Sequence, residues 1–290
     1  GVVGAGQMGR GIAQVAALSG CKVIIMDAVD NALQVGLTAI TTDLTKQVSK
    51  GKLKQEDADA AVSRLSGVTK IDDLDECDFA IEAATENTEV KLEIFRTLDR
   101  ALGKNAILAS NTSSISLTKL AGATRRPERV LGMHFMNPVP LMKLVEVVRA
   151  LQTSEPTYEE TCALATMMGK TLVTTKDMPG FIVNRMLIPF INEACFALQD
   201  GLGTVEDIDQ AARLGLNHPM GPLQLADLIG LDTCLFIAEV LQREFGEDKY
   251  RPSTVLRNYV AANWLGRKTS RGFYVYADGK QERPSGRPPA

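Results

Sequence analysis

The stretch Val-Val-Gly-Ala-Gly-Gln-Met-Gly, residues 2–9, decides the fold of the first part of this chain. It fits the pattern G-x-G-x-x-G and stands after the end of an apolar strand, at the start of a helix of small residues. Gly4 permits a tight turn, Gly6 lets the backbone approach a pyrophosphate, and Gly9 lets the helix pack on the strand. The free N–H groups at the helix N-terminus favour phosphate. The stretch therefore predicts a dinucleotide-binding turn, to which Gln7 and Met8 also belong.

A second apolar strand, KVIIM at 22–26, ends immediately before Asp27. A carboxylate about twenty residues after the glycine motif can accept both ribose hydroxyls of an adenosine, and it repels a 2′-phosphate. This arrangement favours NAD over NADP, although Arg10 beside the turn is a cation that could meet an extra phosphate. The alternative is a glycine-rich turn with a surface aspartate.

Strands and helices alternate through residues 1–176, which predicts a Rossmann-type α/β domain with a mostly parallel sheet covered on both faces. Further strands are expected over 78–83, 106–109, 130–135, 144–148 and 171–174, and helices over 31–50, 56–64, 90–102 and 158–168. The pattern then changes. Residues 177–280 predict a second, all-α domain, whose first helix has Pro179 in its first turn and runs to about Gln199. The last ten residues, QERPSGRPPA, predict a disordered tail over 281–290.

Composition excludes several classes of protein. The 290 residues carry a net charge of −3 and no long basic run, so nucleic acid is not an expected partner. No run of 18 apolar residues predicts a membrane span. Five scattered cysteines without a CxxC pair and two histidines predict reduced thiols in a soluble intracellular protein, and no metal site. Only Val2 and Val3 precede the glycine motif, so we expect a few residues of the first strand, and any targeting segment, before Gly1. The compartment is therefore open.

His134 and Glu146 lie in two strand-like runs separated by Asn137-Pro138-Val139-Pro140. Two strands joined by this turn could bring the two side chains together. Oxidation of a secondary alcohol by hydride transfer needs a base for the hydroxyl proton, and a neutral imidazole suits that role. A carboxylate on the other ring nitrogen fixes the tautomer and stabilises the imidazolium. The alternative is a core histidine bonded to backbone, with a solvated glutamate.

Two other polar positions are candidates for substrate contact. The run SNTSS, 110–114, follows a strand at the carboxyl edge where open α/β sheets bind ligands. Its hydroxyls could bond a substrate oxygen or the nicotinamide, or could merely cap a helix that starts near Ile115. Asn184 is expected one turn into the first helix of the second domain, facing the cleft between the domains, or else simply exposed on that helix.

Together these segments resemble the short-chain 3-hydroxyacyl-CoA dehydrogenases, especially the 3-hydroxybutyryl-CoA dehydrogenase type, over nearly the whole chain. The motifs that carry the resemblance are GAGQMG at 4–9, ASNTSS at 109–114, GMHFMNP at 132–138, MKLVEV at 142–147, PGFIVNR at 179–185, HPMGP at 218–222 and GRKTSRGF at 266–273. Met136 departs from the family, which commonly has Phe there.

The resemblance implies roles for individual residues. It makes His134 and Glu146 the catalytic pair, with Ser113 and Asn184 holding the C3 oxygen and the carbonyl region of the substrate. It places Lys50 at a CoA-binding position, in a lysine cluster that could also be a solvated helix end. The family also dimerises through the helical domain, so a homodimer is implied. The implied NAD contacts are Asp27, Glu86, Lys91, Ser113, Asn137 and Lys268.

The sequence thus predicts an NAD-dependent enzyme that reversibly oxidises (S)-3-hydroxyacyl-CoA, with an acyl-CoA substrate, in fatty acid and butanoate metabolism. Two alternatives stay open: a dehydrogenase of a hydroxy acid or sugar acid without CoA, and a crystallin-like protein that binds NAD without catalysis. The second would be expected to lack His134, Glu146 or Asn184, all of which are present.

Overall fold

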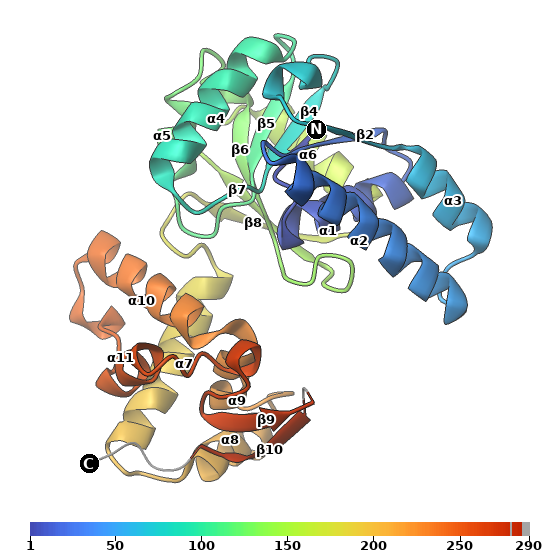
Figure 1. Ribbon diagram of the computed structural model, residues 1–290. Helices are drawn as coiled ribbons and strands as arrows, with labels where there is room; N and C mark the ends of the chain where they lie inside the picture. Colours follow the sequence, from blue (N-terminus) through green and yellow to red (C-terminus); the bar gives the residue numbers. More distant parts are fainter. Residues whose placement is uncertain (279, 286–290) are drawn as a thin grey trace. The chain divides into compact units, whose positions relative to one another are not determined.

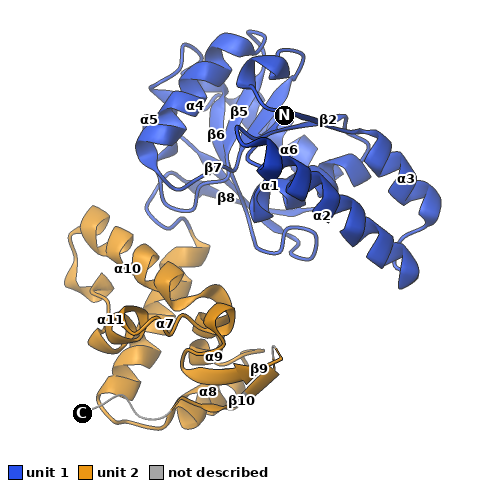
Figure 2. Ribbon diagram, in the orientation of Figure 1, with its two compact units in different colours: residues 1–181 blue, residues 182–290 orange. Residues whose placement is uncertain are grey.

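The computed structural model describes residues 1–278 and 280–285, and the chain divides into two compact units, residues 1–181 and 182–290 (Figure 2). The first unit extends past the boundary expected at residue 176. The reason is Asp177, whose carboxylate accepts hydrogen bonds from Ser116 Oγ (2.8 Å), Leu117 N (3.0 Å) and Thr118 N (2.7 Å) and so ties this segment to the first unit.

The first unit alternates strands and helices along the chain, as Figure 1 shows. Its strands are β1 (Val2–Val3), β2 (Val23–Met26), β3 (Leu65–Val68), β4 (Phe79–Glu82), β5 (Ile107–Ser110), β6 (Val130–Phe135), β7 (Leu144–Arg149) and β8 (Thr171–Lys176). Its α-helices are α1 (Gln7–Leu18), α2 (Asp30–Ser49), α3 (Gln55–Ser63), α4 (Thr88–Ala101), α5 (Leu117–Ala121) and α6 (Glu155–Met167).

The strands form one sheet in the order β3-β2-β1-β4-β5-β6-β7-β8. Neighbouring strands are parallel except β6 and β7, which are antiparallel. The predicted mostly parallel sheet is therefore confirmed. The sequence did not reveal β3, since its four residues (LSGV) include a serine and a glycine and lie at the sheet edge, where burial is incomplete.

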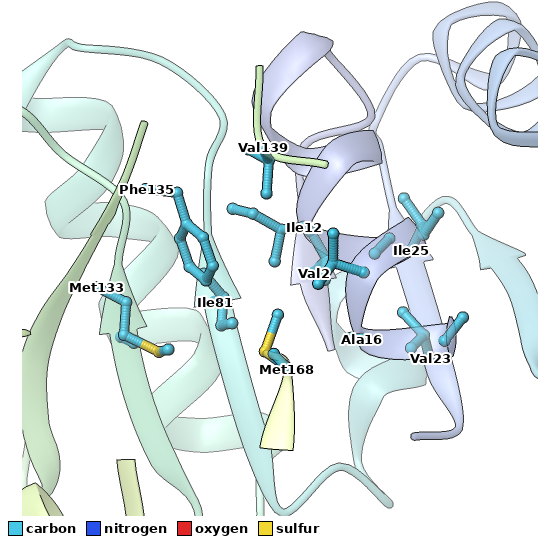
Figure 3. Packing of buried hydrophobic residues seen from close by; sticks show 14 of the residues in the cluster. Val2, Ile12, Ala16, Val23, Ile25, Ile81, Met133, Phe135, Val139 and Met168 are labelled. Atoms are coloured by element: carbon cyan, nitrogen blue, oxygen red, sulfur yellow. The ribbon is translucent and has the colours of Figure 1, made fainter. Parts of the chain in front are cut away.

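Side chains of successive strand residues point to opposite faces of the sheet, and each face has its own core. One core joins alternate residues of β1, β2, β4 and β6 to helices α1, α2, α3 and α6; Ile12 of α1 packs there with Ile81, Met133 and Phe135 of the sheet (Figure 3). The other core joins the intervening strand residues to α4 and α5. In β4, Ala80 belongs to this second core, so by strand periodicity Glu82 faces the α4 side.

The second unit is helical, as predicted, with one small hairpin of strands. Its helices are α7 (Val183–Gln199), α8 (Val205–Gly215), α9 (Pro222–Ile229), α10 (Leu231–Phe245) and α11 (Thr254–Ala261), and its strands are β9 (Tyr274–Ala277) and β10 (Lys280–Pro284). Short 3-10 helices complete the two units at Ile71–Leu74, Pro127–Arg129, Asp248–Tyr250 and Arg267–Thr269. No helix of the described residues is long and apolar enough to cross a bilayer.

Two expectations for this unit were wrong. The first helix begins at Val183, not at Pro179, because Phe181 adopts a positive φ of 48°, which is incompatible with a continuous helix. Residues 281–285 are not disordered, because β10 pairs antiparallel with β9 through backbone groups that composition does not reveal. Residues 286–290 lie outside the described part of the chain.

A buried carboxylate anchors β9 to the helices. Asp227 on α9 accepts hydrogen bonds from Phe273 N, Tyr274 N and the Tyr276 hydroxyl, each at 2.9 Å. A Cβ at Gly272 would lie 1.9 Å from Asp227 Oδ1, so this segment needs glycine for its close approach. Burial raises the pKa of Asp227 to about 6.

Candidate active site

The glycine turn between β1 and α1 has the geometry of a phosphate site. Gly4 has a φ of +102°, and a Cβ at Gly9 would lie 1.8 Å from the carbonyl oxygen of Gly4. A Cβ at Gly6, the N-cap of α1, would meet nothing within 4 Å, and no side chain of the described residues caps this helix end. The first N–H groups of α1 therefore face an open approach, as a bound pyrophosphate requires.

Asp27 is tied directly to the glycine turn. Its Oδ2 accepts a hydrogen bond from Ala5 N at 2.9 Å, and its Oδ1 accepts one from Val29 N at 3.0 Å. The parallel pairing of β1 with β2 brings the ends of the two strands to the same edge of the sheet. The carboxylate thus stands, partly exposed, next to the phosphate turn, where a ribose of a dinucleotide can reach it.

His134 and Glu146 form a buried pair. They are register partners on the antiparallel strands β6 and β7, so their side chains lie on the same face. His134 Nδ1 is 2.7 Å from Glu146 Oε2, and the Phe181 ring lies 5.5 Å from the imidazole. Because an ionised carboxylate can only accept, Nδ1 carries the proton and the neutral ring has its lone pair on Nε2. In the described part of the chain, no group of three His, Cys, Asp or Glu could hold a metal ion.

Ser113 is held by Glu86. Ser113 lies in the loop after β5, and Glu86 lies between β4 and α4. Glu86 Oε1 accepts hydrogen bonds from Ser113 N (2.6 Å) and Ser113 Oγ (2.9 Å). It also accepts from Thr112 Oγ1 and from the backbone and hydroxyl of Ser114. Burial opposes the charge on Glu86, but the nearby Lys91 ammonium and these hydrogen bonds outweigh it, so the pKa of Glu86 is lowered. Glu86 is therefore a carboxylate at neutral pH.

Lys91 on α4 lies next to Glu86 and is almost completely buried. Its ammonium is 2.5 Å from Glu82 Oε2 and 3.5 Å from Glu86 Oε2. Glu86, Lys91 and Ser113, three positions implied by the resemblance, therefore form one cluster. Asn137 lies at the glycine turn instead, where its Oδ1 accepts a hydrogen bond from Gln7 Nε2 at 3.0 Å.

Three other predicted positions lie elsewhere in the two units. Lys50 is exposed immediately after α2 in the first unit. Asn184 is the second residue of α7 rather than one turn into it. Lys268 lies in a 3-10 turn of the second unit, and its ammonium pairs with Asp232 at 2.6 Å.

Sequence reasoning missed Glu82. The signal was present, because residues 78–83 (DFAIEA) are predicted as a strand of a sheet covered on both faces, and a carboxylate buried in such a strand requires a partner. Its partner, Lys91, lies on the next helix of the chain.

Both units match family models. Residues 1–178 match the NAD binding domain of 3-hydroxyacyl-CoA dehydrogenase, and residues 180–276 match its C-terminal domain. The chain belongs to the 3-hydroxyacyl-CoA dehydrogenase family. The resemblance inferred from the sequence motifs is confirmed, and so is NAD as the cofactor of the domain that contains the glycine turn.

Several relatives match this chain over nearly their whole length. A 3-hydroxybutyryl-CoA dehydrogenase of Bradyrhizobium diazoefficiens is 52% identical over 280 residues, which cover 97% of this chain and 96% of the relative. The human mitochondrial hydroxyacyl-coenzyme A dehydrogenase is 41% identical, covering 95% and 90%. The crystal structure of (S)-3-hydroxybutyryl-CoA dehydrogenase from Ralstonia eutropha superposes with a TM-score of 0.92 at 51% identity, covering 96% of this chain and 98% of the other.

Proposed function

We propose that this enzyme catalyses the reversible NAD-dependent oxidation of (S)-3-hydroxyacyl-CoA to 3-oxoacyl-CoA, with 3-hydroxybutyryl-CoA as a substrate. The buried pair of His134 and Glu146, 2.7 Å apart, carries the proposal. The names of the relatives, which are 3-hydroxybutyryl-CoA and hydroxyacyl-CoA dehydrogenases, support the substrate class.

In the oxidation, His134 Nε2 takes the proton of the C3 hydroxyl. When bound, NAD supplies the acceptor for the hydride that leaves C3. Glu146 keeps the proton on Nδ1 before the step and stabilises the imidazolium after it. In the reverse direction, the same imidazolium returns its proton to the 3-oxo oxygen. General acid–base catalysis of this kind contributes about 10²–10⁴-fold to the rate.

Ser113 and Asn184 hold the reacting oxygen and the carbonyl region of the substrate. The Ser113 loop follows β5, and His134 lies on the neighbouring strand β6, where Ser110 pairs with Gly132. The loop and the base therefore share the carboxyl edge of the parallel strands, where open α/β sheets bind ligands.

The cofactor contacts fall into two groups. Gly4, Gly6, Gln7, Met8 and Gly9 form the pyrophosphate turn, while Asp27 binds the adenosine ribose and selects NAD over NADP. Glu86, Lys91, Ser113, Asn137 and Lys268 contact the remainder of the dinucleotide.

The CoA moiety binds along α2. This helix has a hollow of about 390 Å³ lined by hydroxyls and one ammonium, from Thr41, Thr42, Thr45, Lys46 and Ser49. Lys50 follows directly at the helix end. Threonine and serine hydroxyls with lysine ammonium groups suit the phosphates of CoA.

The enzyme is a homodimer through its helical unit. Large apolar side chains are exposed there, among them Met186 (64%), Leu202 (82%) and Leu214 (77%). A subunit interface would bury apolar side chains of this kind. A molar mass measurement by light scattering tests this directly, since a monomeric result would reject it.

The function is tested by a panel of 3-oxo compounds with purified enzyme. We expect NADH-dependent reduction of acetoacetyl-CoA, little reduction of free acetoacetate, and lower activity with NADPH. Longer 3-oxoacyl-CoA substrates, measured in parallel, define the chain-length preference. Equal activity with and without CoA would favour a dehydrogenase of simple hydroxy acids, and no turnover of any substrate would leave only NAD binding.

A further inference from the structure

We propose that Glu82 is a positioning residue for the active site: through Lys91 it fixes Glu86, and through Glu86 it holds the loop that bears Ser113. Glu82 is fully buried, and its side chain binds Ala84 N, Lys91 Nζ and Ser110 Oγ. The inference rests on the proposed function only insofar as Ser113 binds the substrate.

Glu82 ends β4 on the α4 face of the sheet, and its side chain joins β4 to neighbouring elements of the site. Its Oε1 accepts a hydrogen bond from Ala84 N at 2.8 Å. Its Oε2 accepts from Ser110 Oγ at the end of β5 (2.6 Å) and from Lys91 Nζ on α4 (2.5 Å). One carboxylate thus connects β4, β5 and α4 where the Ser113 loop begins.

The second link is Lys91, which has two acidic partners at different distances. Glu82 is 2.5 Å away and Glu86 is 3.5 Å away. The ammonium is 1% exposed, so water cannot take the place of either partner. Because the Lys91 ammonium binds Glu82 at the shorter distance, its contact with Glu86 Oε2 is the weaker one. Glu86 Oε1 is therefore left to accept hydrogen bonds from the loop.

The third link is Glu86. Within the loop, Ser110 and Thr112 hydroxyls accept hydrogen bonds from Thr112 N, Ser114 N and Ile115 N, and Glu86 Oε1 accepts five more. These come from Thr112 Oγ1 (2.7 Å), Ser113 N (2.6 Å), Ser113 Oγ (2.9 Å), Ser114 N (3.1 Å) and Ser114 Oγ (3.2 Å). The Ser113 hydroxyl donates to this carboxylate, and this bond fixes the direction of the hydroxyl group. The orientation of Ser113 is therefore set by Glu86.

Removing the charge of Glu82 changes how the Lys91 ammonium is shared between its two acidic partners. In Glu82→Gln the buried ammonium keeps only Glu86 as an anionic partner. Attraction between full charges, one of them on a buried ammonium, exceeds the net gain from a neutral hydrogen bond. The Glu86 carboxylate is therefore drawn toward Lys91, and the loop at 112–114 loses its acceptor. If Glu82 only supported the fold, Glu82→Gln would lower the free energy of unfolding and would leave the loop at 112–114 bonded to Glu86.

The first test uses amide hydrogen exchange on the enzyme alone, without substrate or cofactor. In Glu82→Gln we expect the amides of residues 112–115 to exchange about tenfold faster, and those of 145–149 to change less than about twofold. Asp99→Asn is the matched control, because Asp99 is also a buried carboxylate in ion pairs, with Arg125 and Arg126, but on the far part of α4. Asp99→Asn should leave the amide exchange rates of residues 112–115 unchanged. Unchanged exchange at 112–115 in Glu82→Gln would overturn the proposal.

If Glu82→Gln does not fold, Glu82→Gln/Lys91→Met removes the anion and the cation together, a change that buried pairs often tolerate. The double variant has no ammonium to draw Glu86 away from the loop. Exchange at 112–115 is therefore expected to stay within about twofold of the wild type, and exchange about tenfold faster there would contradict the role assigned to Glu82 and Lys91.

The second test is a double-mutant cycle with Ser113 on the turnover of acetoacetyl-CoA. We expect Glu82→Gln to lower kcat about tenfold in the wild type but less than about twofold in a Ser113→Ala background, since coupled residues give non-additive effects. Equal losses in both backgrounds would mean that Glu82 does not act through Ser113. Absence of turnover in the wild type would reject the proposed function, while the exchange experiment would still decide the role of Glu82.

Discussion

Replacing Glu146 with glutamine changes one atom of the buried pair and removes its charge. The carboxylate oxygen now lies 2.7 Å from His134 Nδ1 and is completely buried. A glutamine amide in its place can donate to Nδ1, which would move the ring proton to Nε2, the nitrogen that must take the substrate proton. It also leaves the imidazolium without its counter-charge.

The size of the loss follows from the contact. An imidazolium and a carboxylate with charge centres about 4 Å apart attract by about 4 kcal/mol at an effective dielectric constant of 20. Since about 1.4 kcal/mol corresponds to a tenfold change in rate, the charge alone accounts for about 10³-fold in kcat. The tautomer effect acts in the same direction.

The assay is steady-state reduction of acetoacetyl-CoA, followed by the absorbance of NADH, with NADH affinity measured separately by fluorescence. We expect Glu146→Gln to lower kcat by about 10³-fold and to change the NADH Kd by less than about twofold. Glu160→Gln is the matched control, because Glu160 is a largely exposed glutamate of the same unit and its ion pair with Arg129 is 3.5 Å long. A kcat for Glu146→Gln within about threefold of the wild type would refute the role of the pair.

Three further predictions address the cofactor, the substrate and the helical unit. Gly9→Ala would place a Cβ 1.8 Å from Gly4 O, so we expect NADH affinity to fall at least about tenfold in a fluorescence titration; unchanged affinity would contradict the close packing of the turn. Lys50→Ala should raise the KM for acetoacetyl-CoA about threefold to tenfold at low salt with kcat unchanged, whereas Lys22→Ala should not. Burial raises the pKa of Asp227 from 3.8 to about 6, so its protonated form stabilises the fold below about pH 4 and that stability is lost as the pH rises through about 6. The stability advantage of the wild type over Asp227→Asn in urea unfolding should thus fall by about 2 kcal/mol between pH 4 and 7, and a constant difference would contradict the raised pKa.

Features that depend on a few consecutive residues were predictable from the sequence. The glycine turn follows from conformational rules for Gly4, Gly6 and Gly9, and the spacing of two strands around a proline-containing turn led to the hypothesis that His134 and Glu146 meet. The structure places both as register partners on β6 and β7.

Features that depend on the folded backbone and on packing, and not on residue type alone, were not predictable. Strand β10 escaped detection because Lys280–Pro284 has a polar composition and forms a strand only through its pairing with β9. The start of α7 was misplaced because the positive φ of Phe181 is a property of the folded chain. The connection from Glu82 through Lys91 to Glu86 joins β4, α4 and the segment between them, and only the packed sheet brings these side chains together.

The most direct test of the catalytic account is the kcat of His134→Gln for acetoacetyl-CoA reduction, measured beside its NADH Kd. The account predicts that turnover falls by about 10²-fold or more, the scale of general acid–base catalysis, while NADH binds as in the wild type. Wild-type turnover in this variant would show that another group moves the proton, and would contradict the assignment of His134 as the base.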